Sequence, residues 1–353
     1  MFDSLFGLIT HDIGIDLGTA NTLVYVRGKG IVIREPSVIA RHKKTKEILA
    51  IGVQAKKMEG RTPATIEAIR PLKDGVIADF DGTLAMLSYF IGKVHETPEG
   101  VRRIGLPKIP RPRVVIGIPS GVTEVERRAV QEAALSAGAR KAYLIEEPMA
   151  AAIGAGLSVC EAGGIFVVDM GGGTTEIALI SLGGIVLNRG LRIAGDELDE
   201  AIVSYLRMRY SMLLGRASAE ELKLAIGSVV PLPTEKSHVI RGRDLETGLP
   251  KSMKITSFEV REAITPVVQQ IVSRIADTLE SAPPELVSDV IERGIVLAGG
   301  GALLPGFDQL ISEAVKIPVW IADDPLTAVT RGTGRVLDDP GLLRKVRVTG
   351  GLR

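Results

Sequence analysis

The sequence is poor in four features, and each shortage excludes a class of protein. Its single cysteine, Cys160, excludes an internal disulfide framework and favours a reducing compartment. Aromatic residues make up only 4% of the chain, which argues against stacking platforms for bases or sugars. Lys and Arg number 43 against 42 Asp and Glu, so no positive excess favours nucleic acid as a partner. Because no apolar run is long enough to cross a bilayer, the sequence predicts a cytoplasmic protein.

A glycine-rich stretch, FVVDMGGGTTEIA at residues 166–178, is the most informative segment present. An apolar run, an aspartate, three glycines and an alternating run are typical of a strand, a tight turn and a returning strand. Glycine lets a ligand approach the backbone closely, and successive N–H groups of such a turn form an anion-binding concavity. Asp169 at the mouth of the turn suits Mg²⁺ held partly through water. An ordinary hairpin with a glycine-rich turn is the alternative.

The same motif occurs a second time, as IGIDLGTANTLVYV at residues 13–26. The matched pairs are Asp16 with Asp169, Gly18 with Gly171, Asn21 with Thr174 and Thr22 with Thr175. Two such hairpins can face each other across a cleft and hold a nucleotide tail between them. Their agreement in register favours gene duplication and one shared site.

Two segments are candidates for contact with a membrane surface. Met1–Ile9, MFDSLFGLI, gathers its apolar side chains on one side when wound as a helix. Residues 96–113 mix five Arg and Lys residues with aliphatic side chains in a proline-rich loop, which suits anionic lipid. The alternatives are packing on the protein body or disorder for the first segment, and a solvated linker for the second.

The chain is long enough for two lobes, each with its own core, and its elements repeat in order. Each half is predicted to read βββαβαβα, with Thr123 capping one helix and Pro148 opening the next. The lobe I core is expected at 1–34, 77–147 and 330–353 with an insert at 35–76, and the lobe II core at 148–191 and 257–329 with an insert at 192–256. In the second insert we expect helices over 196–214 and 217–226, and beyond it a long helix over 257–281.

Seven stretches carry a resemblance to a known family. They are 13–32, 64–80, 144–156 (LIEEPMAAAIGAG), 167–186, 193–202 (IAGDELDEAI), 283–306 (ending GIVLAGGGALLPG) and 325–329. They resemble the actin, Hsp70 and sugar-kinase superfamily, and within it the MreB family of bacterial actin-like proteins. The resemblance implies an α/β, actin-like fold of two duplicated ribonuclease-H-like lobes with a nucleotide cleft between them.

The resemblance also implies roles for particular residues. Asp16 and Asp169 would bracket Mg²⁺ beneath the phosphates of ATP, with GTP left open as the nucleotide. The phosphates would lie on the backbones of Gly18, Thr19, Ala20 and Asn21 and of Gly171, Gly172, Gly173 and Thr174. Glu147 would orient the attacking water, and the Thr174 hydroxyl would hold the same water or a phosphate oxygen. Helix capping is the alternative for Glu147, and Glu146 is the alternative catalytic neighbour.

The nucleoside is expected to contact three further groups of residues. Gly195 and Asp196 resemble the border of the ribose, and Glu220 and Lys223 the ribose and adenine contacts. A surface ion pair is the alternative for this last pair. Gly299, Gly300 and Gly301 would lie against the adenine or ribose, with a plain strand-to-helix turn as the alternative.

The function implied is that of a slow, filament-coupled ATPase that polymerises on the inner face of the cell membrane. Such filaments would direct cell-wall synthesis and rod shape, with cell-wall synthesis and morphogenesis proteins as partners. Another bacterial actin that positions plasmids or organelles is the nearer alternative, and an Hsp70-like ATPase or a sugar kinase the more distant one. Fold alone does not decide among them.

Overall fold

The chain folds into two compact units in the computed structural model, which describes residues 11–95 and 112–348. Within the described residues, unit 1 comprises 11–95, 112–161, 182–184 and 327–348, and unit 2 comprises 162–181 and 185–326. The predictions made for Met1–Ile9 and for most of the basic loop lie outside the described residues. The finer four-part division of the lobes stays a prediction.

Unit 1 is built on a five-stranded mixed sheet with the order β10-β9-β1-β2-β3. Its strands are β1 (Ile13–Leu17), β2 (Asn21–Val26), β3 (Gly30–Pro36), β9 (Arg113–Ile118) and β10 (Lys141–Glu146). β1 pairs antiparallel with β2 and parallel with β9, and β9 pairs parallel with β10. The near-continuous apolar runs of β1 and β9 fit this arrangement, because strands covered on both faces need no polar side.

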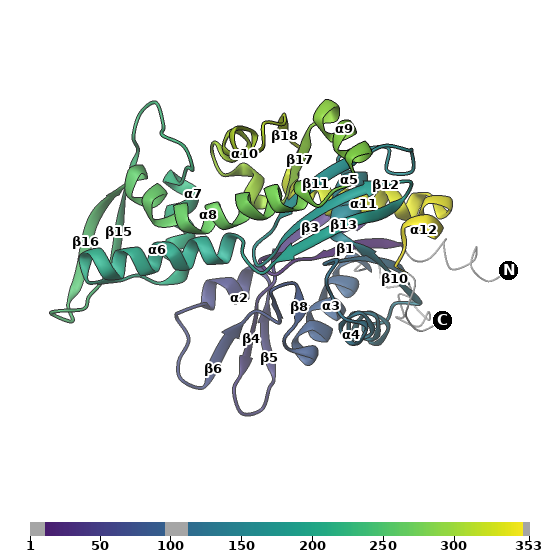
Figure 1. The fold of residues 1–353 in the computed structure, drawn as a ribbon. Helices are drawn as coiled ribbons and strands as arrows, with labels where there is room; N and C mark the ends of the chain where they lie inside the picture. The colour runs from purple at the N-terminus through teal and green to yellow at the C-terminus, as the bar shows by residue number, and fades with distance from the viewer. Residues whose placement is uncertain (1–10, 96–111, 349–353) are drawn as a thin grey trace. The chain divides into compact units, whose positions relative to one another are not determined.

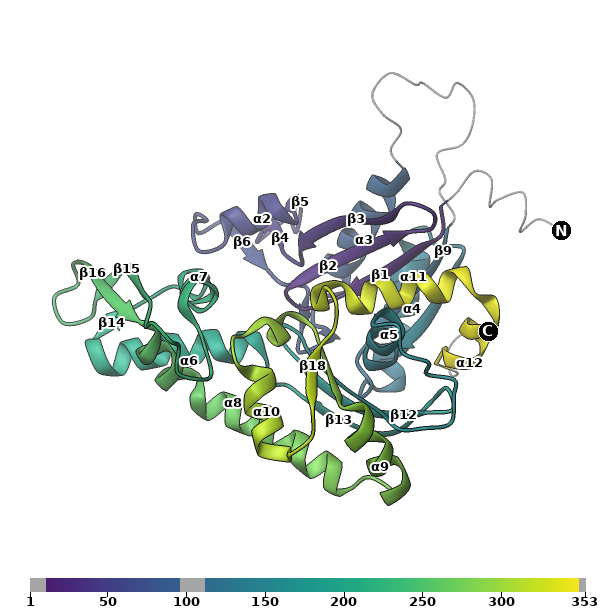
Figure 2. The ribbon, with the colours of Figure 1, turned by 90° about the horizontal axis from the view of Figure 1, so that it is seen from above.

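Helices of unit 1 cover both faces of this sheet. They are α3 (Phe80–His95), α4 (Glu124–Ser136), α5 (Glu147–Gly154), α11 (Ala328–Asp338) and α12 (Pro340–Val346). Ile13 and Ile15 of β1 pack in one core with α3 and α4, whereas the alternate position Gly14 lies against α11. Figure 2 shows α11 running along β1. The predicted capping box of α4 is confirmed, since Thr123 and Glu126 bond reciprocally.

Helices α5 and α11 pack with their backbones in close approach. A Cβ on Gly154 would lie 1.8 Å from the carbonyl oxygen of Ala328, and a Cβ on Gly332 would lie 1.9 Å from that of Ala150. Only glycine fits at such a crossing. This packing places α5 in unit 1, whereas the bounds predicted from the sequence assign residues 148–161 to the lobe II core.

The insert of unit 1 is a small sheet with one short helix. It contains β4 (Ile39–His42), β5 (Ile48–Ile51), α2 (Val53–Met58), β6 (Ile66–Ile69), β7 (Leu72–Lys73) and β8 (Val76–Ile77). The larger of its two sheets has the order β5-β4-β6 (Figure 1). Val38, Ala40 and Ala55 form its own small core, as expected for a subdomain inserted after β3.

Unit 2 repeats the sheet of unit 1. Its strands are β11 (Ile165–Met170), β12 (Thr175–Ser181), β13 (Gly184–Leu191), β17 (Ile295–Ala298) and β18 (Val319–Ile321). Their order, β13-β12-β11-β17-β18, has the antiparallel hairpin and the two parallel pairs in the same places as in unit 1. The predicted duplication of the βββαβαβα order is therefore confirmed.

The helices of unit 2 depart from the predictions at the end of one helix, and unit 2 also contains a hairpin that was not predicted. The helices are α6 (Gly195–Tyr210), α7 (Arg216–Ile226), α8 (Ser257–Glu280), α9 (Pro284–Arg293) and α10 (Phe307–Val315), with 3₁₀ turns η1 (Gly300–Leu303) and η2 (Pro325–Thr327). The helix expected over 196–214 ends at Tyr210, because Ser211 takes a left-handed φ of 49°. Sequence reasoning also missed the hairpin of β15 (Ser237–Asp244) and β16 (Pro250–Thr256), on which β14 (Met212–Leu213) pairs.

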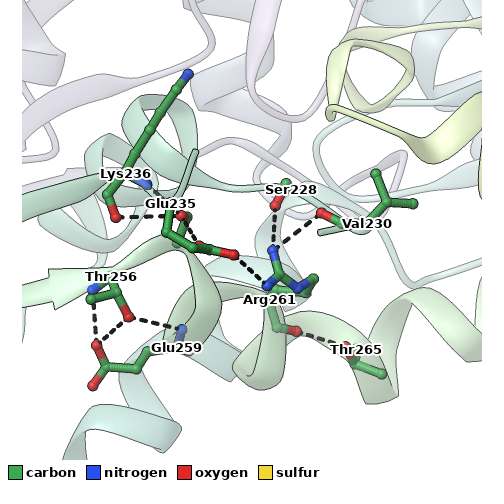
Figure 3. A network of polar contacts seen from close by, with 9 residues as sticks. Ser228, Val230, Glu235, Lys236, Thr256, Glu259, Arg261 and Thr265 are labelled. Atoms are coloured by element: carbon green, nitrogen blue, oxygen red, sulfur yellow. Dashed lines mark hydrogen bonds and ion pairs between the residues drawn. The ribbon is translucent and has the colours of Figure 1, made fainter. Parts of the chain in front are cut away.

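A polar network fixes the start of α8 to the segment that follows α7 (Figure 3). The Arg261 guanidinium donates to the Ser228 hydroxyl and the Val230 carbonyl, both at 3.1 Å, and to the Glu235 carboxylate at 2.8 Å. Thr256 and Glu259 form a capping box one turn earlier. Charge-assisted hydrogen bonds of this kind are the stronger ones in proteins, so the C-terminal end of α7 is firmly anchored.

Candidate functional site

The first glycine hairpin joins β1 to β2 and is braced by side chains of unit 1. A Cβ on Gly18 would lie 2.8 Å from the carbonyl oxygen of Asn21, so the turn requires glycine. The Ser37 hydroxyl lies 2.6 Å from the Gly18 carbonyl oxygen, and the Gly75 N–H donates to the Thr19 hydroxyl at 3.2 Å. No hydrogen bond from the N–H groups of Thr19 or Ala20 is found among the described residues, as expected for an anion-binding turn.

Asp16 and Glu147 are brought together in unit 1 across a glycine. Asp16 of β1 is the register partner of Gly117 in β9. A Cβ on Gly117 would lie 3.4 Å from the Glu147 side chain, which is 9% exposed at the first position of α5. A larger residue at 117 would therefore compete with Glu147 for space. Thr330 of α11 lies 3.4 Å from the Asp16 carboxylate and completes the arrangement.

The second hairpin joins β11 to β12 and has the same turn. Its Gly171 N–H donates to the Thr174 carbonyl at 2.8 Å. A Cβ on Gly171 would lie 3.4 Å from the same carbonyl oxygen, as a Cβ on Gly18 would lie near that of Asn21 in the first hairpin. The carbonyls of Gly171 and Gly172 accept from the first N–H groups of α6, at 3.3 Å and 2.7 Å. No hydrogen bond from the N–H groups of Gly172, Gly173 or Thr174 is found in the described part of the chain. The turn therefore presents donors and no charge of its own, which suits an anion.

Asp169 is a buried carboxylate at the mouth of this hairpin. It is 7% exposed, and burial raises its pKa to about 7. Neither an ion pair nor a hydrogen bond to its side chain is found among the described residues, so nothing in unit 2 offsets the cost of ionising it. A divalent cation would supply the missing charge, so Asp169 fits a metal site. The described residues contain no cluster of three or more His, Cys, Asp and Glu side chains able to hold a metal ion by themselves. A magnesium ion bound through one or two carboxylates, waters and phosphates needs no such cluster.

The predicted nucleoside residues of α6 and α7 are adjacent in unit 2. Lys223 donates to the Gly195 carbonyl at 2.8 Å and forms an ion pair with Asp199 at 2.8 Å. The alternative of a surface ion pair between Lys223 and Glu220 is not what the structure has, since Lys223 points to the start of α6 instead. Asp196 pairs with Arg216 at 2.5 Å, while its N–H contacts the glycine turn.

Two of the three glycines after β17 have a packing reason as well as any binding role. A Cβ on Gly299 would lie 2.4 Å from the Met170 carbonyl oxygen and 2.5 Å from an Asp169 carboxylate oxygen. A Cβ on Gly301 would lie 2.3 Å from the Met170 side chain. Gly299 also has a φ of 78°. These glycines therefore let the β17 turn pack directly on the second hairpin.

Sequence reasoning missed four residues that lie near the hairpins of the two units, each within its own unit. They are Ser37, Gly117, Asp199 and Thr330. A signal existed for Gly117, because it interrupts an otherwise apolar buried strand, where glycine often marks a close approach. The others carry no local signal, since the fold alone brings them to the hairpins.

Two copies of one sheet order, each with a glycine hairpin preceded by an aspartate, define an actin-like protein. The family model described as MreB/Mbl protein matches residues 10–345. The chain belongs to the MreB/Mbl family. No helix among the described residues has the length and apolar character needed to span a membrane.

The sequences of named relatives align with this chain over nearly its whole length. The chain is 51% identical over 342 residues to the cell shape-determining protein MreB of Escherichia coli (strain K12), covering 96% of each chain. It is 46% identical over 342 residues to the cell shape-determining protein Mbl of Bacillus subtilis (strain 168), covering 97% of this chain and 100% of Mbl. The crystal structure of MreB 5 of Spiroplasma citri bound to AMPPNP matches with a TM-score of 0.86 at 38% identity, covering 93% of this chain and 96% of that one.

Proposed function

We propose that this chain is an ATP-hydrolysing bacterial actin that assembles into membrane-associated filaments and directs cell-wall synthesis and rod shape. One observation carries the proposal: both duplicated halves have a glycine turn with unused N–H donors beside an aspartate. Its relatives named cell shape-determining proteins, and the AMPPNP complex of one structural neighbour, support the cellular role and the nucleotide.

Phosphates would bind to the backbone donors of the two turns. The turns supply N–H groups of Gly18 to Asn21 and of Gly172 to Thr174, while the Gly171 N–H closes the second turn on the Thr174 carbonyl. The hairpins, rather than mobile side chains, fix the direction of these donors. Mg²⁺, when bound, would supply positive charge that offsets the phosphates. Asp16 and Asp169 would hold the ion. Its positive charge would offset the cost of ionising Asp169, which is buried and unpaired.

Glu147 would orient the attacking water. It stands at the first position of α5, is largely buried, and lies beside Gly117, the register partner of Asp16. Phosphoryl transfer needs positioning and charge stabilisation more than covalent help, so one well-placed carboxylate suffices. Thr174, at the end of the second turn, would contribute its hydroxyl to the same water or to a phosphate oxygen.

The nucleoside would lie against α6, α7 and the β17 turn. Gly195 and Asp196 would border the ribose, while Glu220 and Lys223 would contact the ribose and the base. Gly299 to Gly301 would present bare backbone to the base or ribose. We also propose that Met1–Ile9 and the 96–113 loop attach the filament to the inner face of the cytoplasmic membrane, on the apolar and basic patterns of their sequences.

Electron microscopy and phosphate release together test this proposal. Purified protein with ATP and Mg²⁺ on anionic lipid should form filaments and release phosphate slowly, and removal of Mg²⁺ by chelation should stop both. Loss of rod shape on depletion in cells, restored by the wild-type gene, would support the cell-shape role. Filaments together with normal cell shape on depletion would favour a bacterial actin that positions plasmids or organelles. A chain that binds ATP without polymerising would contradict the proposal.

A further inference from the structure

Asp199 is a buried carboxylate that contacts the predicted nucleoside residues and has no assigned role. It lies on α6, one turn after Gly195, and is 2% exposed. Its Oδ1 atom lies 2.8 Å from Nζ of Lys223 on α7, in a buried ion pair. Lys223 also donates to the Gly195 carbonyl at 2.8 Å. The carboxylate therefore holds the ammonium group against the start of α6.

The start of α6 is in turn fixed to the phosphate turn of unit 2. Gly195 and Asp196 donate their N–H groups to the carbonyls of Gly171 and Gly172. A Cβ on Gly195 would be 3.4 Å from both the Gly171 oxygen and Lys223 Nζ. Asp199, Lys223, the α6 start and the glycine turn therefore form one connected set of contacts within unit 2.

A purely stabilising role does not account well for this ion pair. Burying two charges costs several kcal/mol in desolvation, and apolar residues of similar volume are often as stable or more stable. An ammonium group has three donors, and the contacts of Lys223 with Gly195 and Asp199 account for two of them. The fixed ammonium thus keeps hydrogen-bonding capacity beside the turn that we propose binds nucleotide.

We propose that Asp199 is the positioning residue for Lys223: it fixes the ammonium at the start of α6 so that Lys223 contacts the bound nucleoside. This inference rests on the proposed nucleotide site and adds to it a residue that does not itself touch the nucleotide. Without the charge of Asp199, Lys223 regains its side-chain rotamers and must be ordered again when the nucleotide binds.

The charge of Asp199 depends on its surroundings. Burial raises the pKa of Asp199 to about 6, against the opposing effect of Lys223, and Glu220 and Asp196 raise it further. Arg216 of α7 is the other charged group near it. Asp199 is therefore mostly ionised at pH 7.5 and mostly neutral at pH 5.5, which gives the positioning role a pH signature.

The test compares the dissociation constant of MgATP for the full-length protein and its variants at pH 7.5 and pH 5.5. Asp199→Asn keeps the size of the side chain and removes its charge. We expect it to weaken MgATP binding about tenfold relative to wild type at pH 7.5, the factor that corresponds to 1.4 kcal/mol. At pH 5.5 the ratio should fall towards one, because wild-type Asp199 is then neutral as well. Taking the ratio cancels titrations of the nucleotide and of other residues.

A double-mutant cycle tests whether Asp199 acts through Lys223. Lys223→Met should weaken MgATP binding by itself, and adding Asp199→Asn should weaken it no further. The matched control is Glu200→Gln, which removes the same charge one residue later on the exposed side of α6 and should bind as wild type. If Asp199→Asn does not fold, the dissociation constants of Lys223→Met and wild type for MgATP test the inference by themselves. Their ratio should also fall towards one at pH 5.5.

Three results would overturn the inference: unchanged binding by Asp199→Asn at pH 7.5, a ratio that is the same at both pH values, or additive effects in the cycle. Wild-type protein that fails to bind MgATP at either pH would instead refute the proposed nucleotide site. The two failures are therefore distinguishable.

Discussion

Gly332→Ala should strongly destabilise unit 1, although alanine is the better helix former. The added methyl would stand 1.9 Å from the carbonyl oxygen of Ala150, so α5 and α11 must separate by roughly 1.5 Å to reach ordinary contact distance. The obstacle is backbone, and no side-chain rotamer can relieve it. Overpacking typically costs about 1–3 kcal/mol, and we expect the upper end here. The helix propensity of alanine returns only about 1 kcal/mol of that cost.

The separation would also disturb the contact of α11 with the central strand. Gly14 of β1 lies so close to this helix that a Cβ there would be 2.3 Å from the Thr333 hydroxyl. A net loss of about 2 kcal/mol lowers the unfolding temperature by roughly 4–8 °C for a unit of this size. Scanning calorimetry of the nucleotide-free protein measures the shift and separates unfolding transitions that do not coincide.

Gly92→Ala is the matched control for this experiment. Gly92 is inside α3 of the same unit, and apart from the backbone of its own helix and its chain neighbours no atom lies within 4 Å of the position that its Cβ would take. The same substitution should therefore stabilise the protein by about 1 kcal/mol through helix propensity. An unchanged unfolding temperature for Gly332→Ala, or an equal loss in both variants, would refute the argument from close backbone packing.

Three further variants test the nucleotide site and the membrane segment. Glu147→Ala should leave ATP binding nearly intact and slow phosphate release at least tenfold, and wild-type turnover would remove Glu147 from the mechanism. Asp169→Asn should weaken Mg²⁺-dependent ATP binding, as titration with and without magnesium would show. The raised pKa of Asp169 means that its burial costs little below pH 4 and most above pH 7, so the nucleotide-free Asn variant should be more stable than wild type at pH 8, by up to about 4 kcal/mol. Phe2→Ser with Phe6→Ser should abolish co-sedimentation with liposomes while ATP binding survives. Pelleting equal to wild type would exclude the terminal segment as the anchor.

Local patterns were sufficient to predict the repeated sheet and both hairpins. Apolar runs, glycine turns and a capping box are short-range signals, and they led to Asp16, Asp169 and the start of α5 at Glu147. The β15–β16 hairpin escaped prediction because its strands alternate weakly and carry many charges. The end of α6 at Tyr210 depends on Ser211, a residue type that rarely takes a left-handed φ.

Long-range contacts explain what sequence reasoning could not find. Asp199 is an ordinary acidic residue in an amphipathic helix until the fold buries it against Lys223. Gly299 and Gly301 look like ligand-binding glycines, and only the structure shows how closely the second hairpin packs against them. Likewise, α5 follows lobe I in sequence and precedes lobe II, and its partner α11 lies far along the chain. Only that pairing decides the unit to which α5 belongs.

The close packing of α5 on α11 also sets the order in which the two units can be completed during synthesis. Unit 2 is nearly continuous in sequence, from residue 162 to residue 326, whereas unit 1 needs residues 327–348 to cover one face of its sheet. During synthesis, the face of β1 that packs on α11 therefore stays uncovered in unit 1 until residues 327–348 have been made. By then all the strands of unit 2 have already been synthesised. A nascent chain has a finished unit 2 available before a finished unit 1, the reverse of the order in which their hairpins leave the ribosome.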